Sequence, residues 1–164
     1  MSAGEFVVLC SVWVAVLCYP AGPAGRRIAP IASRLIWTFG AVAFVVHVIA
    51  AFHVHYQWSH AVALEETARQ TAVMTGRNTG TGLYLNYLFA LLWLLDAGWW
   101  WRDGVGHRSR PKWVHLGLHG FMLFMLINGA VVFVASPMRW LGLVVSLVAL
   151  VALIVSVRHQ TVQP

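Results

Sequence analysis

The sequence predicts an all-α membrane protein, a polytopic transmembrane bundle of five helices. Hydrophobic residues make up 60% of the 164 residues and charged residues only 10%, against about 45–50% and about 25% in soluble domains. A core cannot hide this excess, because a domain of this size leaves about a third of its surface exposed. Composition therefore excludes disordered, collagen-like and disulfide-based chains and nearly every soluble domain.

Five apolar runs give the expected helices. Crossing about 30 Å of hydrocarbon takes about 20 residues, with a range of roughly 17–25. We expect one membrane domain, with helices at about 3–19, 35–56, 83–101, 114–135 and 140–157. The first run is the shortest, and it spans only if its polar N-terminal residues lie at the interface.

The first run, Phe6–Tyr19, is interpreted as a retained helix rather than a cleaved signal peptide. Small residues follow it at Ala21–Gly25, as they would at a cleavage site. However, no Lys or Arg precedes the run, and Glu5 is acidic where a signal peptide is positively charged.

The basic residues predict the orientation of the bundle. Eight of them fall in loops or a tail that the five-helix arrangement places on one side, and three fall on the other side. The richer side is expected to be cytoplasmic, so the N-terminus points out and the C-terminus points in. The eight are Arg26, Arg27, Arg34, Arg102, Arg108, Arg110, Lys112 and Arg158, and the three are Arg69, Arg77 and Arg139.

The outer loop 57–82 is predicted to contain a short polar helix. Ser59 is a candidate N-cap, the helix runs to about Met74, and Gly76 lies just past its end. Glu65 and Arg69 then form an i,i+4 pair. Alternatively, the second helix continues beyond the lipid into this segment.

Histidines and one aspartate are the candidates for chemistry. Asp96 is the only acidic residue well inside an apolar run, and an ionisable group in a membrane span indicates function by default. Asp96 and His119 both lie roughly 10 Å from the inner face, at about 1.5 Å per helical residue. We therefore expect an Asp96–His119 pair, and the alternative is that both groups only hold helices together by hydrogen bonds.

A second prediction is a b-type haem between two helices. His115, His119 and Met122 share one helix face, and imidazole with thioether suits haem iron or copper. His47 lies roughly 18 Å into the second helix, which matches the depth of Met122 or Met125. The candidate cofactor residues are His47, His115, His119, Met122 and Met125.

The outer end of the second helix carries a denser histidine cluster. His53, His55 and His60, with Glu65 or Glu66, have the side chains that bind Cu²⁺ or Zn²⁺. The alternative is a polar cap in which these rings lie at headgroup level.

Three functions follow as hypotheses. The first is a redox-type bundle that binds haem or a metal ion and transfers electrons. The second is a non-catalytic structural or scaffold subunit that contacts other membrane subunits, and the third is a proton or ion path through His47, Asp96 and His119.

The expected surroundings are the lipid bilayer of the inner or plasma membrane, with no nucleic acid, since the basic residues lie between apolar runs. Hydrolytic motifs are absent from the sequence, which does not decide whether the protein is an enzyme.

Overall fold

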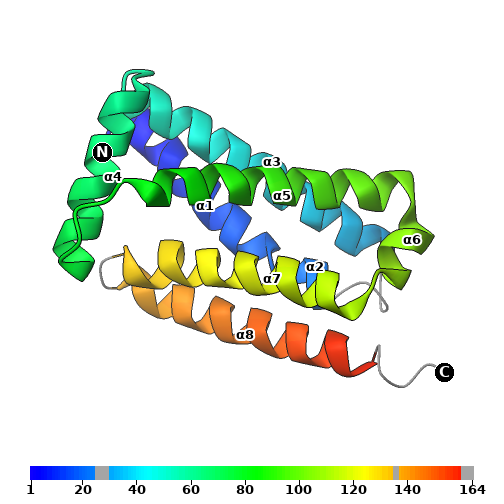
Figure 1. Ribbon diagram of the computed structural model, residues 1–164. Coiled ribbons are helices and arrows are strands. Elements are labelled where there is room, and N and C mark those ends of the chain that lie inside the picture. The colour runs from blue at the N-terminus through cyan, green and yellow to red at the C-terminus, as the bar shows by residue number, and fades with distance from the viewer. Residues whose placement is uncertain (25–29, 135–136, 160–164) are drawn as a thin grey trace.

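The computed structural model describes residues 1–24, 30–134 and 137–159, and the secondary structure within those ranges is helical (Figure 1). This confirms the all-α class. Five long helices run alongside one another, α4 crosses one end of them, and α2 and α6 lie at the other end (Figure 1). The long helices are α1 (Ala3–Cys18), α3 (Pro30–Val54), α5 (Thr81–Arg102), α7 (Lys112–Ile127) and α8 (Met138–His159); the others are α2 (Ala21–Ala24), α4 (His60–Thr75), α6 (Gly104–Ser109) and the π-helix η1 (Asn128–Val132).

Three of these helices are long and apolar enough to cross a membrane: 30–54, 112–132 and 138–158. Their outward faces are apolar, with Phe39 61% exposed on α3 and Leu147 60% exposed on α8. Large apolar side chains facing out indicate a lipid environment, so the structure supports a membrane protein. By length and composition these three helices qualify; α1, with 16 residues, is a shorter apolar helix, and α5 is not among the candidate spans.

The helical conformation is interrupted between α3 and α4. Gln57 and Trp58 adopt positive φ angles of 47° and 62°, a region that interrupts a right-handed helix. The alternative that the second helix continues into the outer loop is therefore wrong. Ser59 caps α4 by accepting a hydrogen bond from the Val62 amide at 3.3 Å, and Gly76 ends the helix at φ 74°.

The expected Glu65–Arg69 pair on α4 is replaced by a pair one residue closer. Arg69 donates to Glu66 at 2.6 and 2.8 Å, and Gln70 donates to the same carboxylate at 2.9 Å. The hydrogen bond from Arg69 lowers the pKa of Glu66 to about 2, with a further contribution from Gln70. Both i,i+3 and i,i+4 spacings place two side chains on one helix face, so the sequence pattern allows Arg69 to pair with either Glu66 or Glu65.

An aromatic core holds α1, α3 and α5 together beside the polar groups described below. The ring of Trp37 lies 5.5 Å from Tyr19 and 4.9 Å from Trp93, and all three side chains are almost completely buried. Phe89 packs edge-on against Trp93 at 5.3 Å. Such ring pairs stabilise a core beyond the area that they bury.

Close backbone contact joins α8 to η1. Gly142 lies against the carbonyl group of Ala130, and a Cβ atom added to Gly142 would overlap that carbonyl. Small residues allow helices to approach in this way when lipid supplies no hydrophobic drive between them.

We expect Gly142→Ala to lower the free energy of unfolding in detergent by about 1–3 kcal/mol, the usual cost of overpacking. Gly98→Ala is the matched control, because a Cβ there meets no atom within 4 Å. Both substitutions gain the same helix propensity, so the difference isolates the close contact. Equal melting temperatures for the two variants would contradict this account of the α8–η1 contact.

A buried polar cluster as candidate functional site

Asp96 on α5 accepts three hydrogen bonds while only 4% exposed. Trp37 Nε1 donates to Oδ2 at 3.0 Å, His107 Nε2 lies 3.0 Å from Oδ1, and Arg110 Nη1 also donates to Oδ1. A buried carboxylate is tolerated when charge and hydrogen bonds compensate for lost water. The partners come from α3, α6 and the α6–α7 junction, so Asp96 ties three parts of the fold together.

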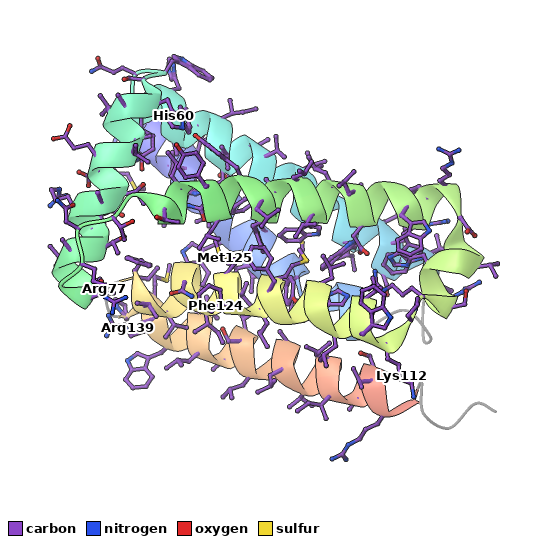
Figure 2. All side chains as sticks on the ribbon, viewed as in Figure 1. His60, Arg77, Lys112, Phe124, Met125 and Arg139 are labelled. Carbon is purple, nitrogen blue, oxygen red and sulfur yellow. The ribbon has the colours of Figure 1, made fainter. Side chains whose placement is uncertain are left out.

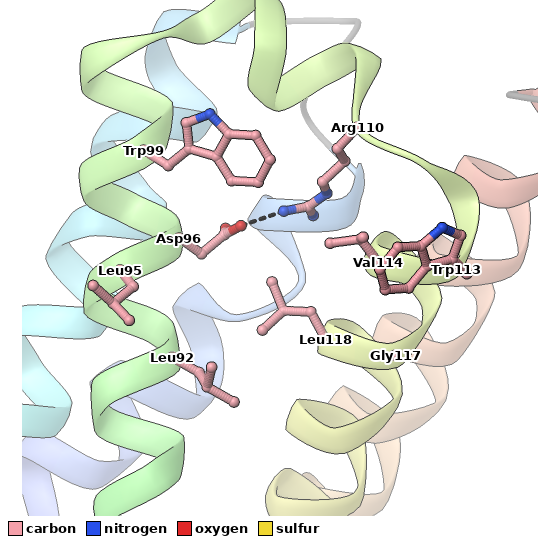
Figure 3. A pocket seen from close by; sticks show the side chains of 9 residues that line it. All are labelled: Leu92, Leu95, Asp96, Trp99, Arg110, Trp113, Val114, Gly117 and Leu118. Carbon is pink, nitrogen blue, oxygen red and sulfur yellow. Dashed lines mark hydrogen bonds and ion pairs between the residues drawn. The ribbon is translucent and has the colours of Figure 1, made fainter.

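The short helix α6 brings two of these partners back to α5. Asp103 caps it by accepting a hydrogen bond from the Gly106 amide at 2.8 Å, which turns the chain directly after α5. His107 and Arg110 follow, three residues apart and both buried. Figure 3 shows the Arg110 guanidinium pointing from this turn toward Asp96.

Arg110 also holds the two histidines of α7. Its Nη2 donates to His115 Nδ1 at 2.8 Å and to His119 Nε2 at 2.9 Å. Guanidinium has no acceptor, so both ring nitrogens accept and carry no proton. His115 then donates through Nε2 to Ser156 Oγ on α8 at 2.8 Å, and that hydroxyl donates to the Leu153 carbonyl. The network thus extends from α3 to α8.

His107 is positioned by tryptophans at the end of α5. Its ring stacks on Trp100 at 4.9 Å with an angle of 14° and meets Trp99 edge-on at 5.5 Å. The consecutive tryptophans at the end of α5 therefore support a buried side chain, in addition to any contact with the membrane interface.

A cavity of about 410 Å³ lies between α5 and α7 beside the cluster (Figure 3). Its wall is apolar except for the Asp96–Arg110 pair and the two indole rings. Several of its residues are exposed on the outer face of the bundle, including Leu95 at 59% and Trp113 at 77%. The lining residues are Leu92, Leu95, Asp96, Trp99, Arg110, Trp113, Val114, Gly117 and Leu118.

The predicted haem ligands are not gathered at one site. His47 Nδ1 lies 2.9 Å from the Val8 carbonyl of α1, ten residues and about 15 Å along α3 from Trp37. Met122 is completely buried in the apolar core, and Met125 packs at its edge. His115 and His119 face Arg110 instead of His47.

A haem or metal ion does not fit the α7 histidines. A metal takes the lone pair of a ring nitrogen, and in both rings a nitrogen already accepts from Arg110. The second nitrogen of His115 donates to Ser156. A guanidinium beside both rings also repels a metal cation.

The expected Asp96–His119 pair does not form a direct contact, because Arg110 bridges the two side chains. Arg110 lies between the two side chains and donates to both, through Nη1 to Asp96 and through Nη2 to His119. The two groups do lie in one network, as their similar depth suggested, but the contact between them is made by a cation.

The outer histidine cluster is also dispersed. Within residues 1–24, 30–134 and 137–159, no group of three or more His, Cys, Asp or Glu side chains has the arrangement of a metal site. His60 packs against the rings of Tyr84 and Tyr87 at 5.8 and 6.0 Å, while His53 packs near Trp58. His55 lies beside Tyr56, Glu65 is exposed, and Glu66 binds Arg69. Figure 2 shows His60 at the end of the bundle opposite Lys112.

Sequence reasoning missed His107, Arg110, Trp37 and Ser156. The sequence pattern places Arg110 among the orienting charges and gives His107 no role. The available signal was Asp96 itself, because a carboxylate inside an apolar helix requires a donor or a cation. The short connection that follows α5 contains a donor, His107, and a cation, Arg110.

Comparison of the chain with known protein families, with curated proteins and with solved structures finds no match.

We expect Arg110→Met to lower the free energy of unfolding by about 3–5 kcal/mol, because it leaves the Asp96 carboxylate buried without its cation. Arg108→Met is the control, since Arg108 is exposed on the same turn. Thermal unfolding in detergent, followed by tryptophan fluorescence, measures both.

Asp96→Asn combined with Arg110→Met removes both charges, and we expect it to be less destabilised than Arg110→Met alone. If Arg110→Met unfolds at the same temperature as Arg108→Met, the buried ion pair is not the constraint described here.

Proposed function

We propose that the protein is a five-span membrane protein, with its N-terminus outside and its C-terminus in the cytoplasm, that binds a membrane-soluble small molecule in the α5–α7 cavity. The proposed location is the inner or plasma membrane. The Asp96–Arg110 pair forms the polar end of the binding site, and the apolar wall accommodates the remainder of the ligand.

The arrangement of the helices supports five spans. α1 and α5 run alongside the three apolar spans (Figure 1). The 22 residues of α5 reach about 33 Å, and the 16 residues of α1 about 24 Å. The capping box of Ser2 and Glu5 gives α1 a polar N-terminus suited to the interface. If the buried Arg110 no longer counts as an orienting charge, the cytoplasmic side still has seven basic residues against three.

This topology predicts which cysteines a membrane-impermeant maleimide reaches in intact cells. Cys10 and Cys18 are first replaced by Ala, and single cysteines are placed at Val73 on α4 or Ser109 on α6, both exposed. Val73→Cys is expected to react from outside, and Ser109→Cys only after permeabilisation. Equal labelling of both in intact cells would mean that α5 does not cross the membrane.

One observation carries the binding proposal: an apolar cavity that contains a buried ion pair and has exposed apolar residues in its wall. Its volume of about 410 Å³ falls within the range of about 300–1,000 Å³ for small-molecule sites. Such sites are mostly apolar with a few polar groups that orient the ligand. Leu95, Trp99 and Trp113 are exposed at its edge, which suits entry of a ligand from the bilayer.

Gly117 offers a direct test of binding. A Cβ at Gly117 or at Gly120 meets no atom within 4 Å, but only Gly117 lines the cavity. We expect native mass spectrometry to detect a small-molecule adduct on the parent protein and on Gly120→Leu, and to find it lost in Gly117→Leu. An adduct retained equally by both variants, or absent from the parent, would contradict the proposal.

The second candidate is a structural or scaffold subunit. This role is supported by the hydrogen-bond network of the cluster, which joins α3, α5, α7 and α8. The residues that make these links include Trp37, Asp96, Arg110 and Ser156. In that role the exposed apolar faces contact other membrane subunits, and no adduct depends on Gly117. A proton path through His47 has less support, because the packed rings of Phe44, Phe89 and Trp93 lie along α3 and α5 between His47 and the cluster.

A further inference from the structure

We infer that the cavity takes a quinone-type ligand: a flat, uncharged ring with carbonyl groups, joined to an apolar tail. This inference rests on the proposed binding site and names the chemical class of its ligand. Four features of the cavity lead to it: an unused donor, a cancelled charge, two tryptophans at the opening, and an apolar lateral exit.

Arg110 supplies the unused donor. Its Nη1 is taken by Asp96 and its Nη2 by His115 and His119. Its Nε is buried and has no acceptor in the part of the chain that the structure describes. A buried donor without a partner costs about 1–3 kcal/mol. Arg110 is one of the residues that line the cavity, and we infer that a ligand carbonyl entering from there supplies the missing acceptor.

The charge at the polar end selects an uncharged head group. Asp96 and Arg110 cancel each other, and their direct contact fixes both charges at the base of the cavity. An anionic head group would meet the Asp96 carboxylate, and a cationic one would meet the guanidinium, in a medium that screens neither. A neutral carbonyl accepts from Arg110 without either penalty.

The shape of the opening selects a flat ring. Trp99 on α5 and Trp113 on α7 border the cavity from opposite helices (Figure 3), and aromatic rings associate with flat π-systems by offset stacking or edge contact. Gly117 leaves the α7 wall without a side chain. Leu92, Leu95 and Leu118 make the rest of the wall apolar, and Leu95 is 59% exposed, so an alkyl tail can continue past it between lipid chains.

The test uses the full-length protein in lipid nanodiscs with decylubiquinone as the probe. Binding of decylubiquinone is followed by quenching of tryptophan fluorescence. Decylbenzene, which has the same tail, no carbonyl and no quenching ring, is the matched probe, and its binding is measured by competition that restores the fluorescence. We expect the parent and Gly120→Leu to bind decylubiquinone within twofold of each other. We expect Gly117→Leu to bind at least tenfold more weakly, and decylbenzene to bind the parent at least tenfold more weakly than decylubiquinone.

An infrared measurement tests the donor without a variant that risks misfolding. On the parent protein, the carbonyl stretch of bound decylubiquinone should move to lower wavenumber than in protein-free nanodiscs, because Arg110 donates to it. An unshifted stretch, equal binding of the two probes, or equal binding by Gly117→Leu and Gly120→Leu would each overturn the inference.

The outcomes also separate this inference from the binding proposal. If native mass spectrometry shows an adduct that depends on Gly117 and decylubiquinone does not displace it, the site stands and the quinone class is wrong. If there is no adduct and decylubiquinone does not bind, the binding proposal fails together with the inference.

Discussion

The ion pair between Asp96 and Arg110 is the constraint on which the α6 end of the bundle depends. Removing two charges from water costs several kcal/mol per ion, and attraction between them offsets this only with good geometry and further hydrogen bonds. The further hydrogen bonds are present, since Trp37 and His107 donate to the carboxylate and two histidines accept from Nη2 of the guanidinium. The route of the chain through α6 follows from this requirement, because the turn must return Arg110 to the level of Asp96.

The same ion pair accounts for the histidines of α7. On an apolar helix, His115 and His119 would need donors or acceptors of their own, and four residues between them place both rings on one face. Arg110 donates to one nitrogen of each ring through Nη2, and Ser156 accepts a hydrogen bond from the other nitrogen of His115. The rings therefore extend the ion pair as neutral acceptors, which is a different role from that of metal ligands.

Sequence reasoning reached the fold class and one half of the cluster. Composition and apolar runs identified an all-helical membrane protein, and counting depth brought Asp96 and His119 to one level. Arg110 was not predicted as a partner of Asp96, because a basic residue in a short connection also fits the rule for loop charges. Only the turn at α6 in the folded structure shows that Arg110 is buried against Asp96 instead. The predicted outer metal ligands are not brought together in the described part of the chain, for a similar reason. Spacing does not reveal that Gln57 and Trp58 turn the backbone and that His60 packs on Tyr84 and Tyr87.

Arginine is required at position 110 by the number and direction of its donors. A guanidinium presents donors on three sides of a rigid plane, whereas an ammonium is a compact point charge. Here one side meets Asp96, a second meets two histidines, and the third, Nε, has no acceptor in the described part of the chain. A lysine could neutralise Asp96, but it could not hold both histidines and keep a donor for the cavity. The fixed contacts orient the plane, so any carbonyl group that binds at Nε meets a donor already held in place, and little ordering remains to be done on binding.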